Sequence, residues 1–275
     1  MKKALIFLVG FTLIFFGLKF SDNSKSLPSG LDKVNNAPSN TSNLHIIRVI
    51  DGDTAILSTN QHVRFLGENS PEHDEGFFQQ AKDLNTSLTL GKQVRLEYQN
   101  EKIDRYGRIL AFVFVGNNLI NAEIVKRGFA VEDFMQKSEK YQSEIISAEN
   151  YAKSNCLGMW EKECKNPCLK IDKIETGNFT KDKNSQFIEI KNDCSSAINL
   201  RNFLLKDTSS SNRYHFKNFV LESGALVDIY SGCGNDAKSY LFWSCPASIY
   251  AIWNKGGDHA FLLDPEGFII ADFKY

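Results

Sequence analysis

The sequence predicts a mainly β protein with α-helices, in which a small β-barrel domain is followed by a β-sandwich. Three observations lead to this prediction. Short β-like runs fill residues 44–115 and recur over residues 170–275, separated by Gly, Asn, Asp and Ser. Helical spacing of apolar residues occurs between and after the first set of strands. At 275 residues, 42% hydrophobic and 24% charged, the chain is long enough for two globular domains.

The N-terminus has the sequence pattern of an export signal. Lys2 and Lys3 precede fifteen uncharged residues, 4–18, which is the pattern of a signal peptide or an N-terminal membrane anchor over residues 1–20. Both alternatives stay open, because the run is short for a spanning helix and no clear cleavage site follows it. Residues 21–43 are rich in Ser, Asn and Pro and predict a flexible linker. We therefore expect an extracytoplasmic protein, secreted or anchored to the membrane.

Residues 44–164 form the first predicted domain. The runs LHIIRVI and TAILST flank Asp51-Gly52, and an Asp-Gly step between apolar runs is a hairpin signal. The motif alone favours a turn, with half of a metal site formed by Asp51 and Asp53 as the alternative. HVRFLG, QVRLEY and ILAFVFV predict further strands, and helices are predicted over 75–91 and around 119–127 and 137–153. This set of elements suits a small barrel of the oligonucleotide-binding type.

The sequence CKNPC, at the start of the second half, predicts a hinge at residues 165–169. Regularly spaced short strands over residues 170–275 then predict a β-sandwich. Trp243 and Trp253 could contact a ligand, but a role in the aromatic core is favoured. A turn and a strand are enough to explain His259 and Asp264.

Six cysteines suit an exported protein with disulfide bonds. Six cysteines allow 15 pairings. Local spacing favours Cys156 with Cys164 and Cys233 with Cys245, which leaves Cys168 with Cys194. A zinc site is disfavoured, because no second cysteine pair and no histidine at ligand spacing accompanies Cys164 and Cys168.

Charge gives no general attraction for nucleic acid. The formal net charge of the chain is −1, and residues 44–164 hold 14 basic and 18 acidic residues. Any attraction to phosphate must therefore come from locally placed arginines.

Four short motifs nevertheless meet the needs of phosphodiester hydrolysis. They are DGDT at 51–54, RFLGENSPE at 64–72, DRYGR at 104–108 and NAEIVKRGFA at 121–130. The reaction needs arginines that hold the phosphate, a carboxylate that orients or deprotonates water, and a hard cation held by oxygen ligands. Each motif alone has an ordinary structural explanation, but together they offer a residue for every role.

In this order and spacing, the four motifs resemble the staphylococcal-nuclease (thermonuclease-like) family over residues 44–160. The resemblance implies a five-stranded barrel with three helices that cleaves DNA and RNA with Ca²⁺ and leaves 3′-phosphate products. It assigns catalysis to Arg64, Glu72 and Arg108. It further assigns three metal ligands and two substrate-binding residues: Asp53, Asn69 and the backbone carbonyl of Ser70 for the metal, and Arg105 and Tyr106 for the nucleotide.

Residues 170–275 resemble the lamin-tail domain, an immunoglobulin-like sandwich that is usually an accessory module with a ligand of its own. Two rivals to the nuclease reading follow. One is a non-catalytic nucleic-acid-binding barrel, and the other is a surface adhesion or scaffold protein that acts through the lamin-tail-like half. The joint presence of Arg64, Glu72 and Arg108 favours the enzyme.

Asn69 stands where members of the family commonly have Asp, so the metal site has lost one negative charge. Because calcium affinity depends on the charge of the ligands, we expect weaker calcium binding without loss of activity. Asn69→Asp should lower the calcium concentration that gives half-maximal nuclease activity. An unchanged value in a calcium titration would refute this explanation.

Overall fold

The computed structural model describes residues 43–134, 139–165, 168–178, 183–209, 211–243 and 252–275. All of them belong to one compact unit of the chain, which spans residues 35–275. The predicted signal peptide or anchor and nearly all of the predicted linker lie outside the described residues, as does part of the predicted hinge. Within the described residues, no helix is both long and apolar enough to cross a membrane.

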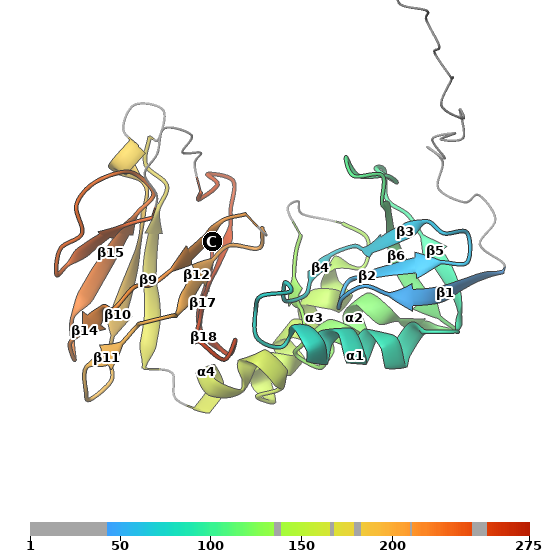
Figure 1. Ribbon diagram of the computed structural model, residues 1–275, viewed down its shortest axis with the longest axis horizontal. Coiled ribbons are helices and arrows are strands. Elements are labelled where there is room, and N and C mark those ends of the chain that lie inside the picture. The colour runs from blue at the N-terminus through green and yellow to red at the C-terminus, as the bar shows by residue number, and fades with distance from the viewer. Residues whose placement is uncertain (1–42, 135–138, 166–167, 179–182, 210, 244–251) are drawn as a thin grey trace, which may run out of the picture. The chain divides into compact units, whose positions relative to one another are not determined.

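A closed barrel of five strands forms the first half, as predicted (Figure 1). Its sheet has the order β3-β2-β1-β5-β6-β7. A parallel pairing of β3 with β6 closes the ring of the first five of these strands, and β7 pairs with β6 outside the ring. The strands of this half are β1 Leu44–Val49, β2 Thr54–Leu57, β3 His62–Phe65, β5 Gln93–Glu97, β6 Ile109–Val115 and β7 Asn118–Leu119. A separate two-stranded ladder joins β4 Glu68–Asn69 to β8 Val131–Glu132.

The helices of this half are α1 Phe78–Thr89, α2 Ile120–Lys126, α3 Gln142–Ser154 and the short α4 Glu161–Lys165, with a 3₁₀ turn at Gly158–Trp160. The first three are those expected. Helix α3 begins at Gln142, because Tyr141 has a left-handed backbone (φ 59°) that cannot be part of the helix; residues 137 and 138 of the predicted span lie outside the described residues. Phe77 (φ 63°) likewise delays the start of α1.

The barrel core consists of residues that alternate along the strands. Ile46, Val63, Phe65 and Ile109 are at most 1% exposed, and most of β6 is buried, since α2 packs against it. The register of β3 matters for the site. Arg64 lies between two buried neighbours, opposite Thr54 on β2 and Leu110 on β6, so its side chain leaves the core and reaches the edge of the barrel.

The second half is a β-sandwich, as predicted. One sheet has the order β16-β15-β10-β9 and the other β13-β12-β17-β18, with a small β11–β14 ladder. The strands are β9 Leu169–Glu175, β10 Phe187–Asn192, β11 Ile198–Asn199, β12 Leu204–Lys206, β13 Arg213–His215, β14 Val220–Leu221, β15 Leu226–Tyr230, β16 Tyr240–Phe242, β17 His259–Leu263 and β18 Ile269–Lys274, with a 3₁₀ turn at Lys183–Ser185.

The sandwich core explains the two tryptophans. Alternate residues of β10, Ile188 and Ile190, point into it, and Trp253 is 1% exposed among them. Trp243 packs against the same core with its ring 5.8 Å from that of Trp253. Their contacts confirm the expected core role.

Both halves contribute to a third apolar cluster. Val131, Met159 and Trp160 of the first half pack with residues of the second, namely Leu204, Phe261, Leu263 and Ile269. Burial of apolar area at this cluster stabilises the two halves together, at about 25 cal/mol per Å² removed from water.

Two of the expected disulfides are present, Cys156–Cys164 and Cys168–Cys194. The first joins the end of α3 to α4, and the second joins the start of β9 to the turn after β10. The third predicted pair, Cys233 with Cys245, includes a cysteine outside the described residues.

Candidate active site

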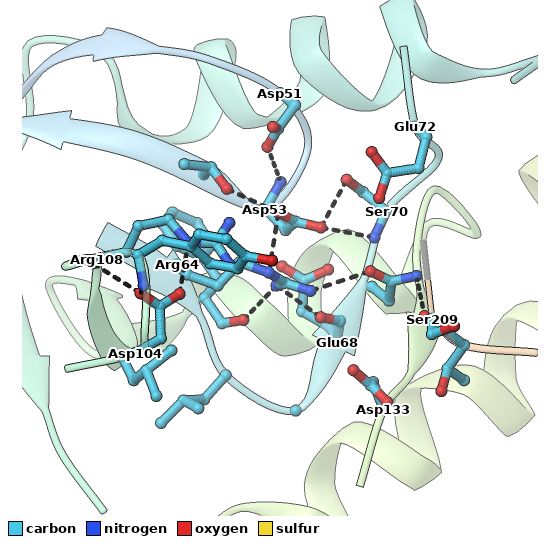
Figure 2. A pocket seen from close by; sticks show the side chains of 18 of the residues that line it. Asp51, Asp53, Arg64, Glu68, Ser70, Glu72, Asp104, Arg108, Asp133 and Ser209 are labelled. Carbon is cyan, nitrogen blue, oxygen red and sulfur yellow. Dashed lines mark hydrogen bonds and ion pairs between the residues drawn. The ribbon is translucent and has the colours of Figure 1, made fainter. Parts of the chain in front are cut away.

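A pocket of about 800 Å³ at the edge of the barrel collects all eight site residues that the sequence predicts (Figure 2). They come from the β1–β2 turn, from β3, from β4 with the loop that follows it, and from the loop before β6. Thr208 and Ser209 of the second half also line this pocket. Asn69 and Thr208, which are 139 positions apart in the chain, are hydrogen-bonded there.

Arg64 lies at the centre of the pocket and is almost completely engaged. Its Nη1 donates to the carbonyl oxygens of Phe65 (2.5 Å) and Glu68 (2.8 Å), and its Nη2 donates to Oδ1 of Asn69 (3.0 Å). Its Nε is 3.3 Å from Oδ1 of Asp53. Burial alone would lower the pKa of Arg64, but the surrounding carboxylates, Asp53 first, raise it. The guanidinium is therefore firmly charged and tied to the loop that follows β4.

Asp53 links this arginine to the rest of the site. Its Oδ2 accepts from both the backbone N–H and the hydroxyl of Ser70 (2.9 Å each), and its Oδ1 accepts from the hydroxyl of Thr54. The Asp51-Gly52 turn holds it in place, because Ile50 N–H donates to the carbonyl of Thr54 and Asp53 N–H to the carboxylate of Asp51. The β1–β2 turn therefore also places the carboxylate of Asp53 in the acidic site.

Gly52 is needed for space. A Cβ at this position would lie 2.5 Å from Cβ of Ser70 and 2.8 Å from Cβ of Ala81. Its φ is not positive, so the turn is not of the type that an Asp-Gly step usually marks. Close packing of the turn on Ser70 is what brings Asp53 to its hydrogen-bond partners.

Asn69 uses both ends of its amide. Its oxygen accepts from Arg64, and its Nδ2 donates to the carbonyl oxygen of Thr208 (3.0 Å). A carboxylate at this position could not make the second bond, since it has no hydrogen to donate. Asn69 is therefore suited to contact the second half, in addition to its predicted role as a metal ligand.

Glu72 lies beyond β4 in the same loop, half-buried at the edge of the pocket. Burial, followed by the charge of Asp53, raises the pKa of Glu72 above its ordinary value. Its backbone N–H donates to Oε2 of Glu75 (3.2 Å), and its carbonyl accepts from Glu75 N–H (2.8 Å). A carboxylate with a raised pKa is a suitable general base for water.

The DRYGR loop forms another wall. The carboxylate of Asp104 accepts hydrogen bonds from the backbone N–H groups of Tyr106 and Arg108 (2.9 Å each). It also forms an ion pair with Nε of Arg108 (2.7 Å). Gly107 has φ +82°, which favours glycine. Tyr106 is 69% exposed, with the guanidinium groups of Arg105 and Arg108 4.8 Å and 5.5 Å from its ring centre. An exposed ring between two arginines is suited to stack on a base.

Five carboxylates of the pocket, Asp51, Glu68, Glu101, Asp104 and Asp133, are not among the eight predicted site residues, and three of them have raised pKa values. Burial is the first cause that raises the pKa of Asp51, Glu68 and Asp133, to about 7 for Asp51. Glu68 is 1% exposed, and neither of its carboxylate oxygens has a hydrogen-bond partner. In the sequence, Glu68 is marked only by its place beside Asn69, and Asp133 by its place after a short buried strand.

The pocket therefore holds more acidic groups than basic ones. Seven carboxylates and three arginines line it. Oxygen ligands in an uncompensated acidic pocket are the environment that a hard divalent cation prefers. The residues present fit calcium on this ground, with Asp53, Asn69 and Ser70 beside the unpaired Glu68.

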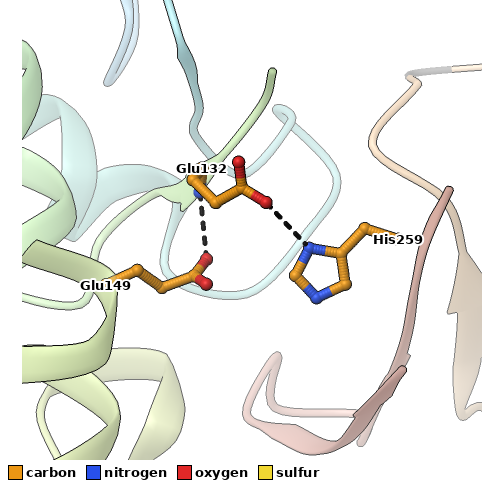
Figure 3. Close-up of side chains that lie close together, drawn as sticks. All are labelled: Glu132, Glu149 and His259. Carbon is orange, nitrogen blue, oxygen red and sulfur yellow. Dashed lines mark hydrogen bonds and ion pairs between the residues drawn. The ribbon is translucent and has the colours of Figure 1, made fainter. Parts of the chain in front are cut away.

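A second acidic cluster lies where β8, α3 and β17 meet (Figure 3). Donor atoms of Glu132, Glu149 and His259 lie within 4.8 Å of one another. This cluster is already neutralised: Lys274 pairs with Glu132, and Lys153 is 3.3 Å from Glu149. Two ammonium groups beside the same oxygens disfavour a divalent cation, so we assign this cluster to the contact between the halves.

His259 completes the charge balance of this cluster. Its Nε2 is 2.6 Å from Oδ2 of Asp272, and its Nδ1 is 3.5 Å from Oε1 of Glu132. Burial alone would lower the pKa of His259, but its bonds to Asp272 and Glu132 outweigh burial and raise it above 6.5. Nearby, burial and then the charge of Asp272 raise the pKa of Glu163 to about 7.

Comparison with known proteins gives the class of the chain. Residues 62–162 match the family model of the staphylococcal nuclease homologues, and residues 165–275 match that of the Lamin Tail Domain. The chain is 34% identical over 124 residues to the thermonuclease of Staphylococcus hyicus, which covers 42% of this chain and 73% of that protein. The thermonuclease of Staphylococcus intermedius is 33% identical over the same length, covering 42% and 74%.

A third relative is the endonuclease YncB of Bacillus subtilis, 30% identical over 131 residues, which cover 44% of this chain and 62% of that protein. The chain belongs to the staphylococcal nuclease family and carries a lamin-tail domain after the nuclease domain. These relatives support a nuclease.

The raised pKa of His259 predicts a pH-dependent stability. Protonated His259 stabilises the folded chain, so this contribution is complete below about pH 6.5, the unfolded value, and is lost as the pH rises through the higher folded pKa. The free energy of unfolding, measured in denaturant between pH 5.5 and 8.5, should therefore fall with rising pH, and His259→Gln should flatten that fall. His62→Gln, which removes an exposed histidine of β3, is the control. An equal slope in His259→Gln and the unchanged chain would contradict the assignment.

Proposed function

We propose that the protein is an exported or surface-tethered, calcium-dependent nuclease that hydrolyses phosphodiester bonds of DNA and RNA and leaves 3′-phosphate products. One observation carries the proposal: Arg64, Glu72 and Arg108 line a single pocket in which carboxylates outnumber arginines and the buried carboxylate of Glu68 has no hydrogen-bond partner. A non-catalytic binding barrel has no need of a carboxylate with a raised pKa opposite two arginines.

The proposed roles follow from the contacts. One hydrogen of Nη2 in Arg64 is left to bind the phosphate. If Nε of Arg64 leaves Asp53 for the phosphate, it supplies a second hydrogen bond. Arg108, one-third exposed, reaches the phosphate from the opposite wall. Glu72 takes a proton from the water that attacks phosphorus, and the bond from phosphorus to the 5′ oxygen breaks.

Asp53, Asn69 and the carbonyl of Ser70 would hold the calcium ion. When bound, calcium supplies positive charge that offsets the charge on the phosphoryl oxygens. The acidity of the pocket supports this set. Ligation by Asn69 requires its oxygen to give up the hydrogen bond from Nη2 of Arg64, which leaves both Nη2 hydrogens for the phosphate.

The substrate class is supported by the outer wall of the pocket. Tyr106 offers an exposed ring for base stacking, and Arg105 and Arg108 flank it with positive charge. Such contacts do not depend on the sugar, in keeping with cleavage of both DNA and RNA. The extracytoplasmic location rests on the N-terminal residues 1–20, and the disulfides suit the same compartment.

Removal of the Glu72 carboxylate tests the proposal. The purified protein should cleave single-stranded DNA with calcium and stop when a chelator is added. Glu72→Gln keeps the shape of the side chain but cannot accept the proton, so kcat should fall by about 100- to 10,000-fold.

Glu101→Gln is the matched control, because Glu101 is an exposed carboxylate at the rim of the same pocket. Its kcat should stay close to that of the unchanged protein. Equal cleavage by Glu72→Gln and the unchanged protein would show that Glu72 is not the base. Cleavage that persists in the chelator would exclude the calcium requirement.

A further inference from the structure

The loop that carries Glu72 is held by the lamin-tail domain at several points. We define the Glu72 loop as residues 69–77. Asn69 donates to the carbonyl of Thr208, and Asp74 is 2.8 Å from Nη1 of Arg213. At the end of the loop, the ring of Phe77 packs edge-on against Phe268, 4.8 Å between centroids. Residues on both sides of Glu72 are therefore fixed by the second domain.

The most buried of these contacts is an ion pair. Nζ of Lys206, at the end of β12, lies 2.7 Å from Oε1 of Glu75, and the two side chains are 7% and 2% exposed. The other oxygen of Glu75, Oε2, accepts the backbone N–H of Glu72. One carboxylate thus connects a lysine of the lamin-tail domain to the main chain of the proposed catalytic base.

The path of the loop also depends on the second domain at the level of the backbone. A Cβ added to Gly76 would lie 1.9 Å from the carbonyl oxygen of Glu266. The two main chains therefore touch, and only glycine allows this approach. Because Thr208 and Ser209 line the pocket itself, the same domain forms one of the walls that substrate would meet.

We propose that the lamin-tail domain is a working part of the nuclease site, and that Lys206 is a positioning residue that holds Glu72 in place through Glu75. The proposal rests on the proposed function of Glu72. It assigns no contact with the reacting atoms to Lys206. The proposed substrate-binding groups Arg64, Tyr106 and Arg108 are held by other contacts, so a loss of Lys206 should affect the chemical step more than substrate binding.

Lys206→Met in the full-length chain tests the proposal, because methionine fills the same buried space without the charge. A displaced base costs rate steeply, so kcat on single-stranded DNA should fall about 10- to 100-fold while KM changes little. Lys206→Arg, which keeps the charge, should restore part of the loss. In hydrogen exchange, amides of residues 70–77 should exchange faster in Lys206→Met than in the unchanged chain.

Lys153→Met is the matched control, because it removes another lysine that joins the two domains, at Asp272, far in the chain from the Glu72 loop. All variants are assayed below their measured unfolding temperatures. An unchanged kcat in Lys206→Met, or an equal loss in Lys153→Met, would overturn the proposal. If the unchanged chain does not cleave, the proposed function fails; unchanged exchange of residues 70–77 in Lys206→Met would separately show that Lys206 does not hold the loop.

Discussion

The candidate site is organised around the buried guanidinium of Arg64. Its hydrogen bonds to the carbonyls of Phe65 and Glu68 and to Asn69 fold the chain after β3 back over the arginine. Its ion pair with Asp53 joins that segment to the β1–β2 turn. Without this charge, Asp53 and Glu68 would be buried together without compensation, which costs several kcal/mol per ion. Arg64 therefore fixes the relative positions of Asp53 and Asn69.

The two acidic clusters of the described residues differ in charge balance, and this difference separates their roles. In the cluster around Glu132, the lysines and His259 compensate the carboxylates, so the cluster joins the two domains. In the pocket, carboxylates outnumber arginines, and Glu68 has no hydrogen-bond partner. The compensated cluster around Glu132 stabilises the contact between the domains. In the pocket, the unfavourable burial of charge supports the proposed binding of a cation and a phosphate.

Much of this could be predicted from the sequence. The alternation of residues along short strands predicts which side chains leave the core, as for Arg64 in HVRF. The order and spacing of the motifs predict that Asp53, Glu72 and Arg108 lie in one site. The role of Gly52 is harder to predict from the sequence, because a side chain at this position would collide with Ser70, which is not part of the local turn. Glu68 could not be separated from an ordinary surface glutamate without knowledge of its burial.

Contacts between the domains could not be predicted at all. Lys206 lies in a short strand with no motif around it, 131 residues from Glu75, and only the packing of the two domains brings them together. The same is true of Thr208 and Asn69. The sequence therefore suggested an accessory module, whereas the structure shows a domain that touches the loop of the proposed base.

The central claim is that the pocket at the edge of the barrel holds calcium. Titration calorimetry of calcium binding to the full chain, without substrate, tests it most directly. The account predicts one saturable calcium site that is lost in Asp53→Ala and retained in Glu132→Gln, since the first change removes a pocket ligand and the second alters the compensated cluster. Binding that survives Asp53→Ala and disappears in Glu132→Gln would place the ion between the domains and contradict the account.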